Sequence, residues 1–373
     1  MSDDEADPEL LALLRQSLGL GGHEHATAPP STGVLESAEY IYDNAIDVAI
    51  SSTGTKKAAE HIYRLMQSKG YSTGTWSTHE LHPKLSETGE EETVNFIFTM
   101  NLLNFSFWSE LPESERFAVE YRGRRWTGYW SLIAALQRAL NEGYTITNPH
   151  FWQDRDACPD SVFEHIFRSA THEPIPLLKE RIAILREAGS ILYEHFGCKP
   201  ANIIRRANGS APVLVNILVE YFPNFRDVAC FQEREVRLYK RAQILVADLW
   251  ACFQGTSYGA FSDIDSLTMF ADYRIPQMLQ GLQCVMYSPR LESRISRQEM
   301  LKAGAEMEIE IRGCSIWCVE LIKKEILRKH PEAKGKVNAI LIDFFLYDTC
   351  KEMEKGGEIE ELLPHHRTRS IFY

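Results

Sequence analysis

The sequence of 373 residues lacks any apolar run of about 18 residues, roughly the length that a membrane-spanning helix needs. Its first residues are acidic, so they have neither the basic and then apolar pattern of a secretory signal nor the Arg-rich pattern of a transit peptide. Positive charge is scarce, because 40 Lys and Arg stand against 52 Asp and Glu and give a formal net charge of −12. Proteins that hold nucleic-acid backbones gather Lys and Arg. We therefore expect no membrane span and no direct nucleic-acid binding, although a few local cations would suffice for a small anion.

The 8 cysteines include no Cys-x-x-Cys pair and no zinc-ribbon spacing. Cysteines scattered in this way are typical of buried free thiols in a reducing compartment, so we expect a cytoplasmic protein. The sequence also lacks Gly-x-Gly-x-x-Gly, the P-loop, Gly-x-Ser-x-Gly and His-Glu-x-x-His. Nothing therefore indicates a nucleotide-dependent redox enzyme or a metallohydrolase, and we expect neither a cofactor nor a metal.

The composition that is present belongs to a globular protein, with 44% hydrophobic and 25% charged residues. Aromatic residues reach 11%, and aromatic rings either fill cores or form flat pockets for flat ligands. Residues 1–35 are predicted to form a flexible acidic extension with a short amphipathic helix at 8–18. Residues 36–373 are predicted to form the main domain.

Helical periodicity dominates that domain. Helices are predicted at 36–50, 56–69, 176–196, 211–221, 239–253, 275–286, 316–329 and 337–354, and a further one from about 129 to 140. Strand-like residues at 93–100 precede a hairpin at 117–121 and 124–127, and a second small hairpin is predicted at 227–231 and 235–239. The alternation at 307–312 predicts a short strand or an extended lead into a helix. The predicted fold class is mainly α with a small antiparallel β element around 93–127.

Polar side chains within apolar patterns point to functional places, because a buried charge is costly unless it is paired or used. The first such place is the apolar helix that carries Asp343, Tyr347 and Asp348. Asp343 and Tyr347 are four residues apart and share a helix face, and Asp348 lies one residue's rotation further round. These groups could face a ligand or form a buried salt-bridge network with Arg or Lys.

The second place is Asp272, which lies between aromatic residues just before a helix that contains Pro276 in its first turn. A carboxylate at that position can cap the helix, or it can face a flat ligand stacked on Phe270. The third place is the start of the apolar helix at 239–253, where Lys240 and Arg241 oppose the helix dipole. A bound phosphate would explain these two cations, and solvent exposure in the preceding hairpin is the alternative.

Several segments of the sequence carry a family resemblance. They read NFSFW at 104–108, YRG at 121–123 with TGYWS at 127–131, YKRAQILVAD at 239–248, TMFADYR at 268–274 and EIRGCS at 310–315. In this order and over residues 36–373, the chain resembles the queuosine salvage protein family, the queuosine 5′-phosphate N-glycosylase/hydrolases. At position 82 the chain has His where the family pattern suggests Asn.

The resemblance implies an N-glycosyl hydrolase that cleaves queuosine 5′-phosphate into queuine and ribose 5-phosphate, so that queuine can return to tRNA through a separate enzyme. It also implies a fold similar to that of helical DNA glycosylases. Two alternatives stay open: a non-catalytic queuine-binding or carrier protein, and a hydrolase of another purine or deazapurine nucleotide.

The resemblance also assigns roles to residues. Asp272 is implied as the catalytic carboxylate. The implied pocket for the base consists of His79, Phe270, Asp272, Asp343, Tyr347 and Asp348. Lys240 and Arg241, with Arg274 in reserve, are the candidates for the 5′-phosphate.

Overall fold

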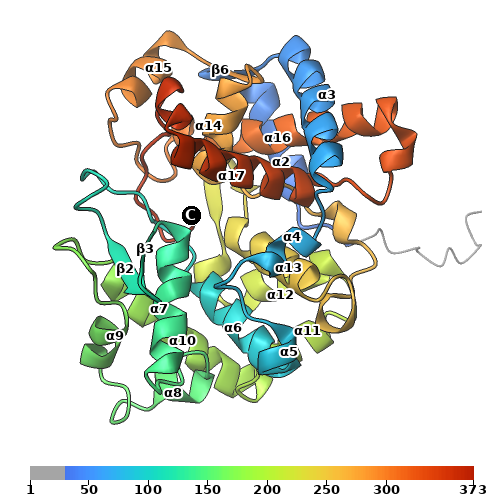
Figure 1. Cartoon of the computed structure of the whole chain (residues 1–373). Helices are drawn as coiled ribbons and strands as arrows, with labels where there is room; N and C mark the ends of the chain where they lie inside the picture. The colour runs from blue at the N-terminus through green and yellow to red at the C-terminus, as the bar shows by residue number, and fades with distance from the viewer. Residues whose placement is uncertain (1–29) are drawn as a thin grey trace, which may run out of the picture. The chain divides into compact units, whose positions relative to one another are not determined.

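Helices make up most of residues 30–373, which are the residues that the computed structural model describes (Figure 1). The predicted helix at 8–18 and most of the predicted extension lie outside the described residues. The helices are α2 (Val34–Asn44), α3 (Ser52–Lys69), α4 (Gly74–Thr78), α5 (Leu85–Thr88), α6 (Glu90–Leu102), α7 (Tyr129–Asn141), α8 (Pro149–Gln153), α9 (Asp160–Ile166), α10 (Leu178–Phe196), α11 (Pro200–Arg206), α12 (Ala211–Tyr221), α13 (Lys240–Cys252), α14 (Arg274–Gly281), α15 (Pro289–Ser296), α16 (Glu306–Lys329) and α17 (Ala339–Gly356). The mainly α fold class is confirmed.

Short antiparallel strand pairs complete the described fold. The pairs are β1 (Val48–Ile50) with β6 (Val285–Tyr287), β2 (Ala118–Tyr121) with β3 (Arg124–Thr127), and β4 (Val228–Phe231) with β5 (Arg234–Arg237). Both predicted hairpins are confirmed. In the β2–β3 turn, Arg122 and Gly123 have φ values of 51° and 70°, the left-handed conformation that a tight two-residue hairpin requires.

The strand predicted at 93–100 is wrong, because these residues lie within α6. They are buried on almost every side of the helix, so the segment has no exposed face. The spacing of its apolar residues therefore cannot distinguish a helix from a strand. Its first turn carries Glu90, Glu91 and Glu92, which favour a helix N-terminus through the dipole.

The short strand predicted at 307–312 is also wrong, because this segment lies in α16. Its alternation arises from two buried glutamates with specific partners. Glu308 accepts from Arg312 and from the hydroxyl of Tyr373, and Glu310 accepts the backbone N–H groups of residues 46–48. Two further predictions change at their ends: the helix of 275–286 stops at Gly281 before β6, and that of 36–50 stops at Asn44 before β1.

Figure 1 shows the helices in two groups, with α2, α3 and α14–α17 in one and α5–α12 in the other. In the first group, α16 packs against α2, α3, α14 and α17. Gly313 allows the close approach of α16 and α2, because a Cβ there would stand 2.5 Å from Cδ1 of Ile41. In the second group, α6 packs against α7, α10 and α11.

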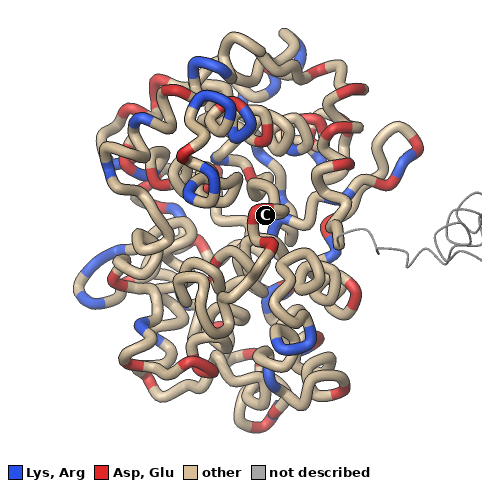
Figure 2. The backbone as a smooth tube through the Cα atoms, turned by 90° about the vertical axis from the view of Figure 1, so that its right-hand side faces the viewer, with Lys and Arg blue, Asp and Glu red and all other residues tan. Residues whose placement is uncertain are grey.

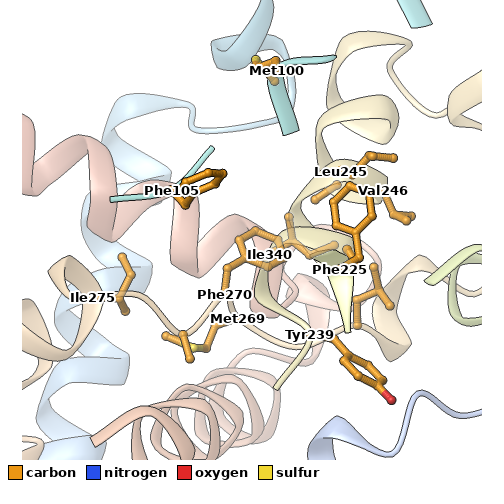
Figure 3. Packing of buried hydrophobic residues seen from close by; sticks show 14 of the residues in the cluster. Met100, Phe105, Phe225, Tyr239, Leu245, Val246, Met269, Phe270, Ile275 and Ile340 are labelled. Atoms are coloured by element: carbon orange, nitrogen blue, oxygen red, sulfur yellow. The ribbon is translucent and has the colours of Figure 1, made fainter. Parts of the chain in front are cut away.

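Helix α13 packs against α6, α12 and α4. Leu245 and Val246 of this helix belong to the same buried hydrophobic cluster as Phe270 and Ile340, all of which Figure 3 labels. The last residue, Tyr373, also contacts both groups, since its carbonyl accepts from the N–H of Ser106 and its hydroxyl donates to Glu308 in α16.

Acidic and basic segments are interspersed on the side of the molecule that Figure 2 shows. Among residues 30–373, no helix is long and apolar enough to cross a membrane.

Candidate active site

A cavity of about 1150 Å³ opens between the elements that the sequence analysis singled out. Its lining comes from α4, the loop after α6, the start of α7, α13, the segment around 270–277, α17 and the last residues of the chain. Eight of the nine predicted site residues line it: His79, Lys240, Phe270, Asp272, Arg274, Asp343, Tyr347 and Asp348. Arg241 does not.

Asp272 lies at the N-terminus of α14, and it both caps this helix and lines the cavity. Its Oδ1 accepts from the backbone N–H groups of Arg274 and Ile275, at 2.8 and 3.0 Å. These bonds fix the orientation of the carboxylate. No described residue donates to Oδ2, so this oxygen is available to a ligand in the cavity. The capping role and the ligand-facing role are therefore compatible.

Asp343 projects from α17 toward the same place. Its Oδ2 accepts from the N–H of Phe270 at 2.9 Å, and the residue is buried. Burial, and next the charge of Asp272, raise the pKa of Asp343 well above its ordinary value. Asp343 forms no ion pair with an Arg or Lys among the described residues, so the proposed buried salt-bridge network is absent there.

Asp248 of α13 is a third buried carboxylate in the lining, and the sequence analysis assigned it no role. Its oxygens accept from Nε1 of Trp76 at 2.9 Å and Nδ2 of Asn101 at 2.8 Å. Burial raises the pKa of Asp248 to about 7. A single Asp within the otherwise apolar run at 244–250 was the signal that could have identified it.

Lys240 is buried at the start of α13, so the alternative of solvent exposure is wrong. Burial lowers the pKa of this ammonium, whereas the charges of Asp272 and Asp343 act against that shift. No described residue accepts a hydrogen bond from its Nζ. We call Asp248, Asp272 and Asp343, together with Lys240, the carboxylate wall.

The other two phosphate candidates already have partners. The guanidinium of Arg241 donates to the carbonyls of Asn101 and Leu102 at the end of α6 and to that of Asn224, so it ties the start of α13 to two other backbone segments. Arg274 lines the cavity but forms an ion pair with Glu354 and donates to Oε1 of Gln277 at 2.9 Å. Lys240 is therefore the stronger candidate for an anion.

A second side of the cavity, which we call the aromatic wall, consists of Trp76, His79, His82, Tyr129 and Trp130. The rings of His79 and Trp130 are stacked with centroids 3.3 Å apart, and those of His82 and Trp76 are stacked at 3.8 Å. Burial lowers the pKa of His79 to about 4 and that of His82 to about 3, so both rings are neutral at pH 7.

His82 is fixed at both ring nitrogens. Nδ1 donates to the carbonyl of Trp76 at 2.7 Å, and the neutral Nε2 accepts from the hydroxyl of Tyr129 at 3.0 Å. Only His79 of this wall was a predicted site residue. The others were not distinguishable in sequence from aromatic residues of the core.

Tyr347 and Asp348 continue the lining along α17. Asp348 accepts a hydrogen bond of 2.5 Å from the hydroxyl of Tyr71, which the sequence analysis also missed. Burial raises the pKa of Asp348. The cavity thus offers carboxyl groups that can stabilise positive charge and flat rings that can bind a planar polar ligand. The ammonium of Lys240 can bind an anion. Within residues 30–373, no group of His, Cys, Asp and Glu could hold a metal ion.

Comparison with known proteins gives a consistent result. Residues 81–373 match the family model described as queuosine salvage protein. The queuosine 5′-phosphate N-glycosylase/hydrolase of Schizosaccharomyces pombe is 44% identical over 352 residues, which cover 91% of this chain and 99% of that protein. The protein of the same name from Mus musculus is 41% identical over 348 residues, covering 92% and 99%. That from Sphaerobacter thermophilus is 38% identical over 342 residues, covering 91% and 98%.

Proposed function

The chain belongs to the queuosine salvage protein family, and on that basis we propose that it hydrolyses the N-glycosidic bond of queuosine 5′-phosphate. Water is consumed, and the products are queuine and ribose 5-phosphate. Queuine would then be available for insertion into tRNA by a separate enzyme. The substrate is a free nucleotide, which needs no broad basic surface. The cytoplasmic location expected from the cysteines stays a prediction.

The observation that carries the proposal is the carboxylate of Asp272, fixed by two backbone N–H groups and unpaired at Oδ2. Cleavage of an N-glycoside passes through a ribosyl cation that resembles an oxocarbenium ion, by analogy with O-glycosides. A fixed carboxylate beside C1′ stabilises that cation in a site where water does not screen the charge. Asp272 can do so by electrostatics, by orienting a water molecule or through a brief covalent bond.

The leaving base places a further demand on the site. Queuine is a 7-deazaguanine, so it has no N7 that could accept a proton and assist departure. We assign this assistance to Asp343, because its buried carboxyl group lines the cavity, and burial raises its pKa and so favours the protonated form that can donate a hydrogen bond to the departing base. The flat base would stack against the aromatic wall at His79.

The remaining groups correspond to the rest of the substrate. Asp348, held by Tyr71 further along α17, is our candidate for the cationic amine or the diol of queuine. Lys240 is our candidate for the 5′-phosphate, since its ammonium is buried and unpaired among the described residues. Arg274 is the second candidate, provided that its ion pair with Glu354 opens.

The decisive experiment incubates the purified protein with queuosine 5′-phosphate and measures queuine and ribose 5-phosphate. We expect the two products in equal amounts over many turnovers. Binding of queuine without release of ribose 5-phosphate would instead identify a carrier. A panel that includes guanosine 5′-phosphate and a simple 7-deazaguanosine 5′-phosphate tests the third possibility, since faster cleavage of either one would reassign the substrate.

A further inference from the structure

The segment of residues 268–272, which carries Phe270 and Asp272, belongs to no helix or strand. Its position therefore depends on hydrogen bonds from other elements. We propose that Arg312 of α16 is a positioning residue for Asp272, because its guanidinium holds the backbone directly before the catalytic carboxylate. This inference rests on the function proposed above for Asp272.

Arg312 makes its contacts with all three guanidinium nitrogens. Nε donates to the carbonyl of Ala271 at 3.0 Å. The two terminal nitrogens donate to Oδ1 and Oδ2 of Asp227 at 3.1 and 2.5 Å. The carbonyl of Ala271 belongs to the peptide group that links Ala271 to Asp272, so fixing this oxygen restricts the backbone of Asp272 as well.

The guanidinium is itself held in one place. The side chains of Arg312 and Asp227 are each only 4% exposed. Glu308 lies one helical turn before Arg312, with Oε1 at 3.4 Å, and it also accepts from the hydroxyl of Tyr373 at 2.7 Å. A buried guanidinium between two carboxylates has no alternative partner, so it cannot leave without a large cost.

The same network also reaches Lys240, which is the first residue of α13 and the cation of the carboxylate wall. Oδ2 of Asp227 accepts from the backbone N–H of Lys240 at 3.2 Å. One buried ion pair therefore holds both the segment that ends in Asp272 and the first residue of α13. This connection sets the position of Asp272 relative to Lys240.

Other contacts fix the beginning and the middle of the segment. The N–H of Thr268 donates to Oε1 of Gln243 at 3.1 Å, and that of Phe270 donates to Asp343. Figure 3 shows Phe270 packed among apolar residues at this point. The contact with Arg312 is the last of this series before Asp272. Loss of this contact would allow the backbone before Asp272, and with it the carboxylate, to shift slightly. A misplacement of about 1 Å can lower the rate roughly 10²-fold.

The test is Arg312→Lys, because lysine keeps the positive charge between Asp227 and Glu308 but cannot reproduce the planar fork and the Nε donor. We expect kcat to fall by about 10²-fold, while KM and the affinity for queuine stay at the wild-type values. The matched control is Arg186→Lys. Arg186 also bonds two backbone carbonyls, those of Trp152 and Cys158, and the carboxylate of Asp160, but it does not line the cavity. The control should lose stability without losing kcat.

A wild-type kcat in folded Arg312→Lys would overturn the proposal. An equal fall of kcat in the control Arg186→Lys would also overturn it, and so would a rise of KM in Arg312→Lys that accompanies the fall of kcat. If Arg312→Lys does not fold, Asp227→Asn decides the question. The amide keeps the size of the side chain but weakens its hold on Arg312, so kcat should fall while the affinity for queuine, which has no phosphate, stays at the wild-type value. An unchanged kcat overturns the proposal. Wild-type protein and Asp272→Asn are measured in parallel: an inactive wild type refutes the proposed function, whereas an active wild type with an active Arg312→Lys refutes only the positioning role.

Discussion

The carboxylate wall and the aromatic wall both bury titratable groups, but burial shifts the pKa values of the two walls in opposite directions. On the aromatic wall, burial lowers the pKa values of His79 and His82 until both rings are neutral at pH 7. On the carboxylate wall, burial raises the pKa values of Asp248 and Asp343. Asp272 is less deeply buried than Asp248 and Asp343. Its Oδ1 accepts hydrogen bonds from backbone N–H groups. Burial therefore favours the neutral form of the titratable groups on both walls. The aromatic wall is suited to binding a flat base, whereas on the carboxylate wall Asp272 is the group suited to stabilising developing charge.

The largest effect is expected from Asp272→Asn, which removes one charge from the carboxylate wall. Turnover should fall by at least about 10³-fold, because an amide cannot stabilise the ribosyl cation. Asparagine can still cap α14, so the protein should fold normally and bind queuine with wild-type affinity. The measurements are kcat, thermal unfolding and the dissociation constant of queuine. Near-normal turnover would show that the catalytic carboxylate is another residue.

Lys240→Ala tests whether the cation of the same wall binds the phosphate. Loss of a charge-assisted hydrogen bond of about 1.5–3 kcal/mol should lower kcat/KM for queuosine 5′-phosphate by roughly 10- to 100-fold. The value for queuosine, which has no phosphate, should stay close to wild type. Lys199→Ala serves as the control, because Lys199 forms an exposed ion pair with Glu91 away from the cavity. If the ratio of kcat/KM for queuosine 5′-phosphate to kcat/KM for queuosine is unchanged, Arg274 becomes the candidate for the phosphate.

His79→Ala tests the aromatic wall, where binding and not chemistry should suffer. Stacking of a base on an aromatic ring contributes about 1–3 kcal/mol, which corresponds to roughly 5- to 150-fold in affinity. We expect KM and the dissociation constant of queuine to rise, with kcat little changed. His172→Ala, an exposed site outside the cavity, provides the control. A fall of kcat at unchanged KM would mean that the aromatic wall contributes to the chemical step and not to binding.

The smallest effect concerns stability and pH. The pKa of Asp248 is about 7 in the folded protein, against about 3.9 for an ordinary Asp. Between these values the folded state binds more protons than the unfolded state, so the stability that this group contributes is lost as pH rises toward and through 7. The slope from Asp248 is at most about 1.4 kcal/mol per pH unit. In urea unfolding between pH 5 and 8, Asp248→Asn should lose less stability with rising pH than wild type. Equal slopes would contradict the shifted pKa.

The sequence predicted the elements with clear signals. The hairpin at 118–127 has turn residues suited to a tight turn, and α17 combines an apolar pattern with polar residues at helical spacing. The strand prediction failed in α6, because residues 93–102 are buried on nearly every side of the helix and show no exposed face that would reveal its period. It failed again in α16, because Glu308 and Glu310 alternate with apolar residues but are buried by partners distant in the sequence.

The lining of the cavity was predictable where a charge interrupts an apolar pattern, as at Asp272 and Asp343. The tertiary contacts of those charges were not. Nothing in the sequence distinguished Lys240, which faces carboxylates, from Arg241, whose guanidinium holds backbone carbonyls. Adjacent residues on a helix point in different directions, about 100° apart, so their environments depend on the packing of other elements.

Three tryptophans, Trp76, Trp108 and Trp130, line the cavity, in a chain that contains 7. The indole of Trp76 donates to Asp248, and that of Trp130 stacks on His79. Indole emission responds to nearby rings and charges, so an occupied cavity should change the intrinsic fluorescence of the protein. The fold thus contains its own optical reporter of ligand occupancy, and titration with queuine would follow binding without any label and without turnover.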